Sequence, residues 1–136
     1  MVTGGYDGST FYQSTEFVYP DGSVVPGKDM PLPRRSHCMA SLDSTRVIII
    51  SGYEYPDPLS GKRSVSTLIY DSKTDSFEPG PELKKARASM ACGVFRSGLL
   101  QSQLLLVAGG SGGSNKVEYL DFKRSYELGW QEGKNT

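Results

Sequence analysis

Residues 76–80 read Ser76-Phe77-Glu78-Pro79-Gly80, and related stretches occur twice more in the chain. They are Ser23-Val24-Val25-Pro26-Gly27 and Gly129-Trp130-Gln131-Glu132-Gly133, so the closing glycines are evenly spaced at positions 27, 80 and 133. The same spacing pairs Met30 with Leu83, Arg34 with Arg87, Ser36 with Ser89 and Leu42 with Phe95. Because these chemically matched positions share one spacing, the sequence predicts a structural repeat of about 50 residues.

A second recurring feature is an apolar run that ends in glycine, at residues 2–5, 47–52 and 104–110. Its last glycines, Gly5, Gly52 and Gly110, are unevenly spaced, so the difference in length is expected in loops. The expected loops are 97–103 and the long connection 54–64. A short alternating segment then follows each run, at residues 16–19, 67–71 and 117–121. Alternation of this kind is typical of a half-buried strand.

One full unit therefore contains four strand signals, which in the last unit lie near residues 88–95, 104–108, 117–122 and 128–131. No stretch shows ten or more residues of helical periodicity, and 16 glycines in 136 residues supply many turns. Four short strands recurring at this period are typical of β-propeller blades. The predicted fold is all-β, with blades of four antiparallel strands.

The pattern resembles the kelch repeat, in which an arginine, an apolar strand, a di-glycine, a Tyr-Asp segment and an aromatic residue follow one another. The second unit matches with Arg34, Ile48 to Ile50, Gly52, Tyr70, Asp71, Phe77 and Gly80-Pro81. The third unit matches with Arg87, Leu104 to Val107, Gly109-Gly110, Val117-Glu118, Asp121, Trp130 and Gly133. It departs from the pattern where Ser51 replaces the first glycine, Phe77 and Val24 replace tryptophan, and Leu120 replaces tyrosine.

The repeat divides the chain into a partial first blade (1–33), a second blade (34–86) and a third blade (87–136). About two and a half blades cannot close a propeller ring, which needs about four to eight. The chain is thus expected to be part of a larger kelch protein, with apolar end faces that favour self-association.

Cys38 and Cys92 are one residue out of register with the repeat, which pairs position 38 with position 91. Equivalent strands would then point the two thiols to opposite faces, so a mutual disulfide is not expected. The lack of a disulfide framework and of an Asn-x-Ser/Thr sequon favours a reducing compartment such as the cytoplasm.

Charge and motif content argue against several function classes. Fifteen basic and fifteen acidic residues balance, which disfavours nucleic acid, and no apolar run approaches the length of a membrane span. His37 is the only histidine, so a two-histidine metal site cannot form. Residues 109–116 lack the Gly-Lys-Ser/Thr sequence and the following helix of a phosphate loop, and residues 71–76 lack the glycine of a calcium loop.

Similarity to the kelch family implies a non-enzymatic scaffold that binds or recruits a protein partner, without a catalytic residue, metal or cofactor. The alternative is a piece of a propeller enzyme whose catalytic groups lie on other blades. The resemblance places partner binding on the face with the arginines and the loops after the glycines. Candidate partner-binding residues are Arg34, Arg35, Ser36, Arg87, Ser89, Tyr6, Tyr53 and Ser111. For Arg34 and Arg87 the alternative is structural, with each holding a carboxylate inside the stack, and this is the preferred interpretation. Residues assigned to the structural motif are Gly5, Gly52, Gly109, Gly110, Phe77 and Trp130.

Overall fold

The structure is a computed structural model that describes residues 1–56, 61–98, 102–112, 115–122 and 126–133. It is all-β, as predicted, with four antiparallel sheets that remain open and do not close into a barrel or ring. In the described part of the chain, the one helical segment is the 3₁₀ turn η1 (Tyr126–Leu128), and no helix there could span a membrane.

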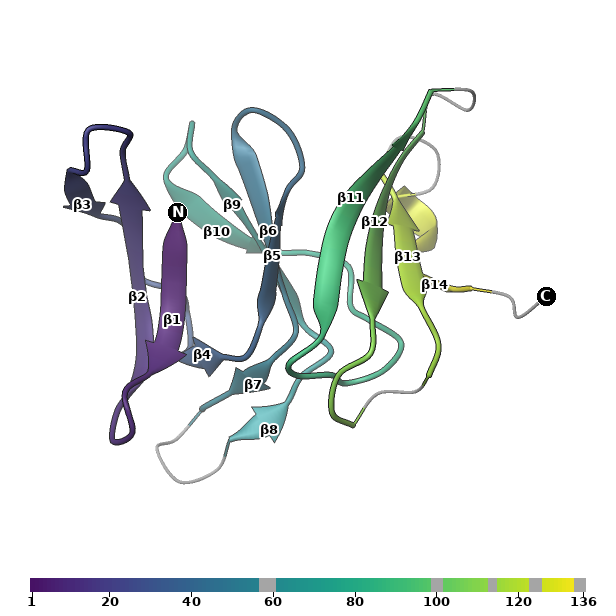
Figure 1. The fold of residues 1–136 in the computed structure, drawn as a ribbon, viewed down its shortest axis with the longest axis horizontal. Helices are drawn as coiled ribbons and strands as arrows, with labels where there is room; N and C mark the ends of the chain where they lie inside the picture. Colours follow the sequence, from purple (N-terminus) through teal and green to yellow (C-terminus); the bar gives the residue numbers. More distant parts are fainter. Residues whose placement is uncertain (57–60, 99–101, 113–114, 123–125, 134–136) are drawn as a thin grey trace.

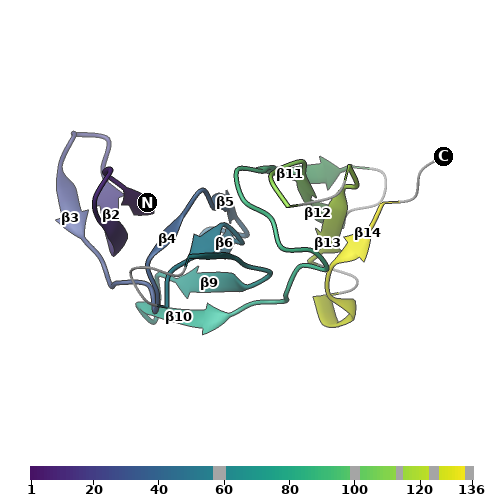
Figure 2. The same ribbon diagram turned by 90° about the horizontal axis from the view of Figure 1, so that it is seen from below.

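Three of the sheets are blade-like and follow one another along the chain. Blade 1 contains β1 (Val2–Tyr6), β2 (Phe11–Val18) and β3 (Val24–Pro26). Blade 2 contains β5 (Cys38–Ser41), β6 (Arg46–Ile50), β9 (Thr67–Asp71) and β10 (Ser76–Pro79). Blade 3 contains β11 (Ala91–Ser97), β12 (Ser102–Ala108), β13 (Glu118–Asp121) and β14 (Gln131–Glu132). Figures 1 and 2 show the three blades side by side in chain order.

The fourth sheet is small and was not expected from the sequence. It pairs β4 (Arg34–Arg35) with β7 (Tyr53–Glu54), and β7 with β8 (Lys62–Arg63). The connection 54–64 was expected to be a loop, but two-residue strands are too short to produce a readable alternation. This sheet lies at the lower edge of the molecule in Figure 1, below blade 2.

Strand register shows that the sequence repeat is also a structural repeat. Equivalent cross-strand pairs occur in the three blades: Val2 with Glu16, Ile49 with Leu68, and Val107 with Glu118. The three repeated glycines also donate equivalent backbone hydrogen bonds: Gly27 to Thr15 (2.7 Å), Gly80 to Thr67 (3.0 Å) and Gly133 to Val117 (2.8 Å). The even spacing of these glycines in the sequence therefore corresponds to equivalent turns in the three blades.

Burial along the central strands shows how the blades pack. In β6, the three residues Ile48 to Ile50 are all fully buried, because the two faces of blade 2 are both covered. Ile48 and Ile50 join a core with Leu105 and Val107 of blade 3. In β12, residues alternate between buried and half-buried, as expected for a sheet with one covered face.

The glycine turns have the same unusual backbone in all three blades. Gly4, Ser51 and Gly109 have φ values of 59°, 56° and 69°, so the serine keeps the left-handed conformation expected of glycine. The next residue in each turn is Gly5, Gly52 or Gly110. A Cβ on Gly110 would lie 2.6 Å from the carbonyl oxygen of Ala88, so glycine is required there.

The two aromatic residues of the motif, Trp130 and Phe77, both pack against neighbouring groups. Trp130 is buried, and its Nε1 donates a hydrogen bond to the carbonyl of Pro81 at 2.9 Å. Phe77 is half-buried against Tyr70, with ring centroids 5.1 Å apart. Trp130 thus ties blade 3 to the segment that leaves blade 2.

Cys38 and Cys92 form a disulfide, with their Cα atoms 6.1 Å apart, so the expectation of two separate thiols is wrong. Cys38 lies on β5 and Cys92 on β11, which belong to facing sheets rather than to one sheet. Two facing sheets meet through opposite faces of their equivalent strands. A displacement of one residue therefore brings the two thiols together.

We expect the disulfide to stabilise the packing of blade 2 against blade 3. In the chain-entropy treatment, closing a loop of this sequence separation lowers the entropy of the unfolded chain and contributes about 4 kcal/mol. Adding a reductant should therefore lower the free energy of unfolding by about 2–4 kcal/mol in a urea titration. The Cys38→Ser/Cys92→Ser variant should start at the lower value and not respond to reductant. Identical titrations of the natural chain with and without reductant would contradict the assignment.

Candidate functional site

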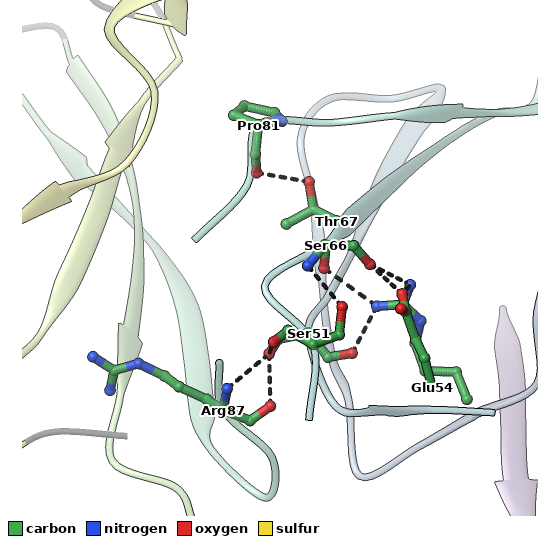
Figure 3. A network of polar contacts seen from close by, with 8 residues as sticks. Ser51, Glu54, Ser66, Thr67, Pro81 and Arg87 are labelled. Atoms are coloured by element: carbon green, nitrogen blue, oxygen red, sulfur yellow. Dashed lines mark hydrogen bonds and ion pairs between the residues drawn. The ribbon is translucent and has the colours of Figure 1, made fainter. Parts of the chain in front are cut away.

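Arg34 begins the second repeat unit and is almost completely buried, with 2% of its surface exposed. Its Nη1 donates to the carbonyl of Ser51 at 2.7 Å, and its Nη2 donates to Ser66 Oγ at 2.8 Å and to the Glu54 carboxylate. Figure 3 shows this network around Ser51, Glu54 and Ser66. Burial lowers the pKa of Arg34, and the Glu54 charge opposes that shift. Arg34 therefore stabilises the interior of blade 2.

Arg87 occupies the same repeat position in the third unit and is fully buried with its partner Glu118. Its Nε lies 3.1 Å from Glu118 Oε1, and its Nη1 donates to the Gly109 carbonyl at 3.0 Å. Its carbonyl accepts hydrogen bonds from Ser51 Oγ at 2.6 Å and from Gly52 N at 2.9 Å. Arg87 thus joins blade 2 to blade 3 through its backbone (Figure 3).

Ser36 and Ser89, also candidate binding residues, share another structural role. Both have left-handed backbones, with φ values of 54° and 55°. The backbone N–H of Ser89 donates to the Ser36 carbonyl at 2.8 Å, which links the segments that lead into β5 and β11. The backbones of these serines and the side chains of the buried arginines therefore stabilise the framework of the blades.

Replacing Arg87 should be much more costly than replacing a surface arginine. Arg87→Ala leaves the Glu118 carboxylate buried without its cation, and breaking such a pair costs about 3–5 kcal/mol. Arg46, whose ion pair with Asp43 is exposed, supplies the matched control, and Arg46→Ala should cost less than about 1 kcal/mol. Denaturant unfolding measures both effects. Similar losses in the two variants would contradict a structural role for Arg87.

The other candidates, Tyr6, Arg35, Tyr53 and Ser111, lie at the same end of the molecule. This end carries the small sheet and the turn between β1 and β2, at the lower edge in Figure 1. Sequence reasoning did not select three further members of the cluster, Phe11, Tyr55 and Arg63. We call these seven residues the Arg35 face.

Arg35 lies at the centre of the aromatic side chains of this face. Its Cζ is 4.9 Å from the ring centroid of Tyr53, 5.4 Å from Tyr6, 5.7 Å from Phe11 and 5.9 Å from Tyr55. Its Nε also donates to the Tyr55 hydroxyl at 2.7 Å. A guanidinium within about 6 Å of a ring is attracted by the ring's quadrupole. The cluster is therefore held together by one cation and several rings.

The aromatic rings of Tyr6, Phe11 and Tyr55 form a continuous stack. The centroids of Tyr6 and Phe11 are 4.5 Å apart with the rings inclined by 15°, and Phe11 stacks on Tyr55 at 13°. An open groove of about 510 Å³ runs beside the stack. Its lining includes Thr10, Phe11, Gln13, Leu32, Pro33 and Tyr55. The stack thus borders a concave surface that combines apolar and polar groups.

Tyr53 connects this cluster to blade 3. Hydrogen bonds with Ser111 and Arg63 lower the pKa of the Tyr53 hydroxyl below its usual value of 10. Ser111 follows the glycine turn of blade 3, and its N–H donates to the Ala88 carbonyl at 2.8 Å. Residues from all three repeat units therefore meet on the Arg35 face.

His37, the chain's only histidine, is half-buried between blades 1 and 2. Its Nε2 is hydrogen-bonded to Thr3 Oγ1 at 2.9 Å, while its Nδ1 is buried without a partner in the described structure. Burial, followed by the charge of Arg34, lowers the pKa of His37 to about 4. The neutral imidazole thus belongs to the packing between blades 1 and 2.

This depressed pKa predicts acid sensitivity in a defined window. Between pH 6.5 and about 4 the unfolded chain binds a proton at His37 that the folded chain does not, so stability falls as the pH decreases. The loss approaches about 3 kcal/mol at 1.36 kcal/mol per pKa unit. The single imidazole resonance in an NMR titration should report the low pKa directly. His37→Gln should flatten the stability profile in this window, and a titration midpoint near 6.5 would contradict the burial argument.

Metal-ligating groups among the described residues and comparisons with known proteins give no indication of the function of this chain. The described residues contain no group of three or more His, Cys, Asp or Glu side chains that could hold a metal ion. A scan of protein-family models and a search of curated proteins found no match to this chain. Function is therefore inferred from the repeat and from the Arg35 face.

Proposed function

We propose that this chain is a non-enzymatic protein-interaction scaffold built of kelch-type β-propeller blades, and that the Arg35 face binds a protein partner. The observation that carries this proposal is the gathering of four aromatic rings around Arg35. Tyrosine and arginine are enriched among the residues that dominate protein interfaces. In this chain, the arginine and the tyrosines of the Arg35 face lie together, next to buried residues of the framework.

The framework beneath the face supports a binding role. Arg34 and Arg35 are consecutive in β4, and successive side chains of a strand point to opposite sides. Arg34 is fixed in the interior by Ser51, Glu54 and Ser66, so the direction of Arg35 is set as well. A rigid side chain loses less conformational entropy when it binds a partner. The rings of Tyr6, Phe11 and Tyr53, which are at least partly exposed above the buried Tyr55, therefore form a preorganised surface.

Charge on the exposed part of the face is mainly positive. Arg35, Lys62 and Arg63 lie on β4 and β8, whereas Glu54 is paired with buried Arg34. Asp7 near the turn accepts hydrogen bonds from Tyr12 and from Ser9 and Thr10, which hold its pKa below the usual range. A protein segment with acidic side chains would match this charge.

Peptides selected from a random phage-displayed library against the immobilised chain test the proposal. Tyr6→Ala removes one exposed ring of the face, and Tyr19→Ala removes a similarly exposed tyrosine beyond the opposite end of β2. If Tyr6 is an interface hot spot, selected peptides should bind the Tyr6→Ala variant about 30-fold more weakly, which corresponds to about 2 kcal/mol. Binding to Tyr19→Ala should be unchanged.

Both variants must retain the melting temperature of the natural chain, because the two tyrosines are exposed. Failure to select any peptide, or equal binding of the selected peptides to both variants, would contradict the proposed binding face. Selection of peptides without acidic residues would contradict the charge argument while leaving the location intact.

A further inference from the structure

In the part of the chain that the structure describes, each of the two outer blades has one uncovered sheet face. We define the front face of a blade as the one turned toward the preceding blade, and the rear face as the one turned toward the next. Cys92 and Val94 of β11 pack against blade 2, so they lie on the front face of blade 3. Phe95, the next residue, points to the rear, where 57% of its surface is exposed.

The rear face of blade 3 is apolar and slightly hollow. Phe95 and Gly93 of β11 lie beside Leu104 and Leu106 of β12, which are half-buried. A shallow depression of about 310 Å³ covers this face, with Ala91, Gly93, Phe95, Leu106 and Ala108 in its lining. Among the described residues, no charged side chain belongs to this lining. The rear face of blade 3 therefore has the apolar composition of a buried sheet face.

The equivalent face of blade 2 shows what such a surface binds. Leu42 occupies the repeat position of Phe95, and it is only 6% exposed because blade 3 covers it. Ile48 and Ile50, counted back from Gly52, correspond to Leu106 and Ala108, counted back from Gly110. Both isoleucines are fully buried. The rear face of blade 3 thus repeats a surface that already packs against a front face.

The front face of blade 1, which has no counterpart of β11, repeats the part of the other half that β12, β13 and β14 supply in blade 3. Thr3 contacts Met39 of blade 2 and Phe17 packs near Tyr70, so their neighbours Val2 and Val18 point to the front. Val24 is the cross-strand partner of Val18 and shares its face. These three valines are 52–53% exposed.

In blade 3, the positions of these valines are filled by Val107, Leu120 and Trp130, which are buried against blade 2. Glu16 lies beside Val2 at the position of Glu118, which is also buried at that junction. The front face of blade 1 therefore has the same register and apolar pattern as the front face of blade 3, which packs on the rear face of blade 2.

We propose that the rear face of blade 3 binds the front face of blade 1 of a second copy of this chain. The contact would continue the packing of blade 2 on blade 1 and of blade 3 on blade 2. It joins two different surfaces, so it is head-to-tail and can close into a ring. Two chains together bring six blade-like sheets, within the range of about four to eight at which propellers close. This inference does not depend on partner binding by the Arg35 face.

A complementation experiment tests this geometry with two single variants. Phe95→Asp places a charge on the rear face of blade 3, and Val24→Asp places one on the front face of blade 1. Each variant alone should be monomeric by sedimentation at concentrations where the natural chain forms a dimer. A mixture of the two should recover a one-to-one complex, because each variant retains the face that the other lacks.

Leu128→Asp is the control, because Leu128 is 73% exposed on η1, outside both faces. It should associate like the natural chain. Circular dichroism and cooperative melting must show that all variants fold. A monomeric natural chain, association that survives both face substitutions, or a mixture that stays monomeric would each overturn the proposal.

Discussion

The buried arginine at the start of each complete repeat unit is the interaction on which the rest of the structure depends. Arg34 donates to the carbonyls of Ser51 and Ser66, and Arg87 donates to the carbonyls of Gly109 and Lys116 at the equivalent positions. The first acceptor in each case belongs to a left-handed turn at the end of the central strand. One guanidinium therefore fixes the turn, the following strand and the segment between neighbouring blades.

The carboxylates that neutralise these arginines come from different places. Arg34 pairs with Glu54, just after the glycine turn, whereas Arg87 pairs with Glu118 on β13. Burial of a guanidinium is costly unless its charge is compensated. The repeat thus preserves the cation and its carbonyl acceptors, and only the source of the negative charge changes. This explains why the arginine is evident in the repeat and its acidic partner is not.

Sequence patterns predict the features that depend on local chemistry and spacing. The all-β fold, the central strands and the glycine turns all agree with the structure. The disulfide was missed because spacing within a repeat does not say which sheets face each other. The expectation of a reducing compartment rested partly on unpaired cysteines, and that support is lost because disulfides persist mainly in oxidising surroundings.

The Arg35 face shows a similar limit. Arg35 and Tyr53 are each adjacent to a framework position, so strand alternation could suggest that they point outward. Phe11 and Tyr55 are distant from Arg35 in the sequence. The packing of blade 1 beside β4 brings Phe11 to Arg35, and the pairing of β7 with β4 brings Tyr55 there. The face consequently exists only while the blades remain stacked. The same buried arginines and disulfide that maintain the stack thereby maintain the proposed binding surface, although none of their side chains is exposed on it.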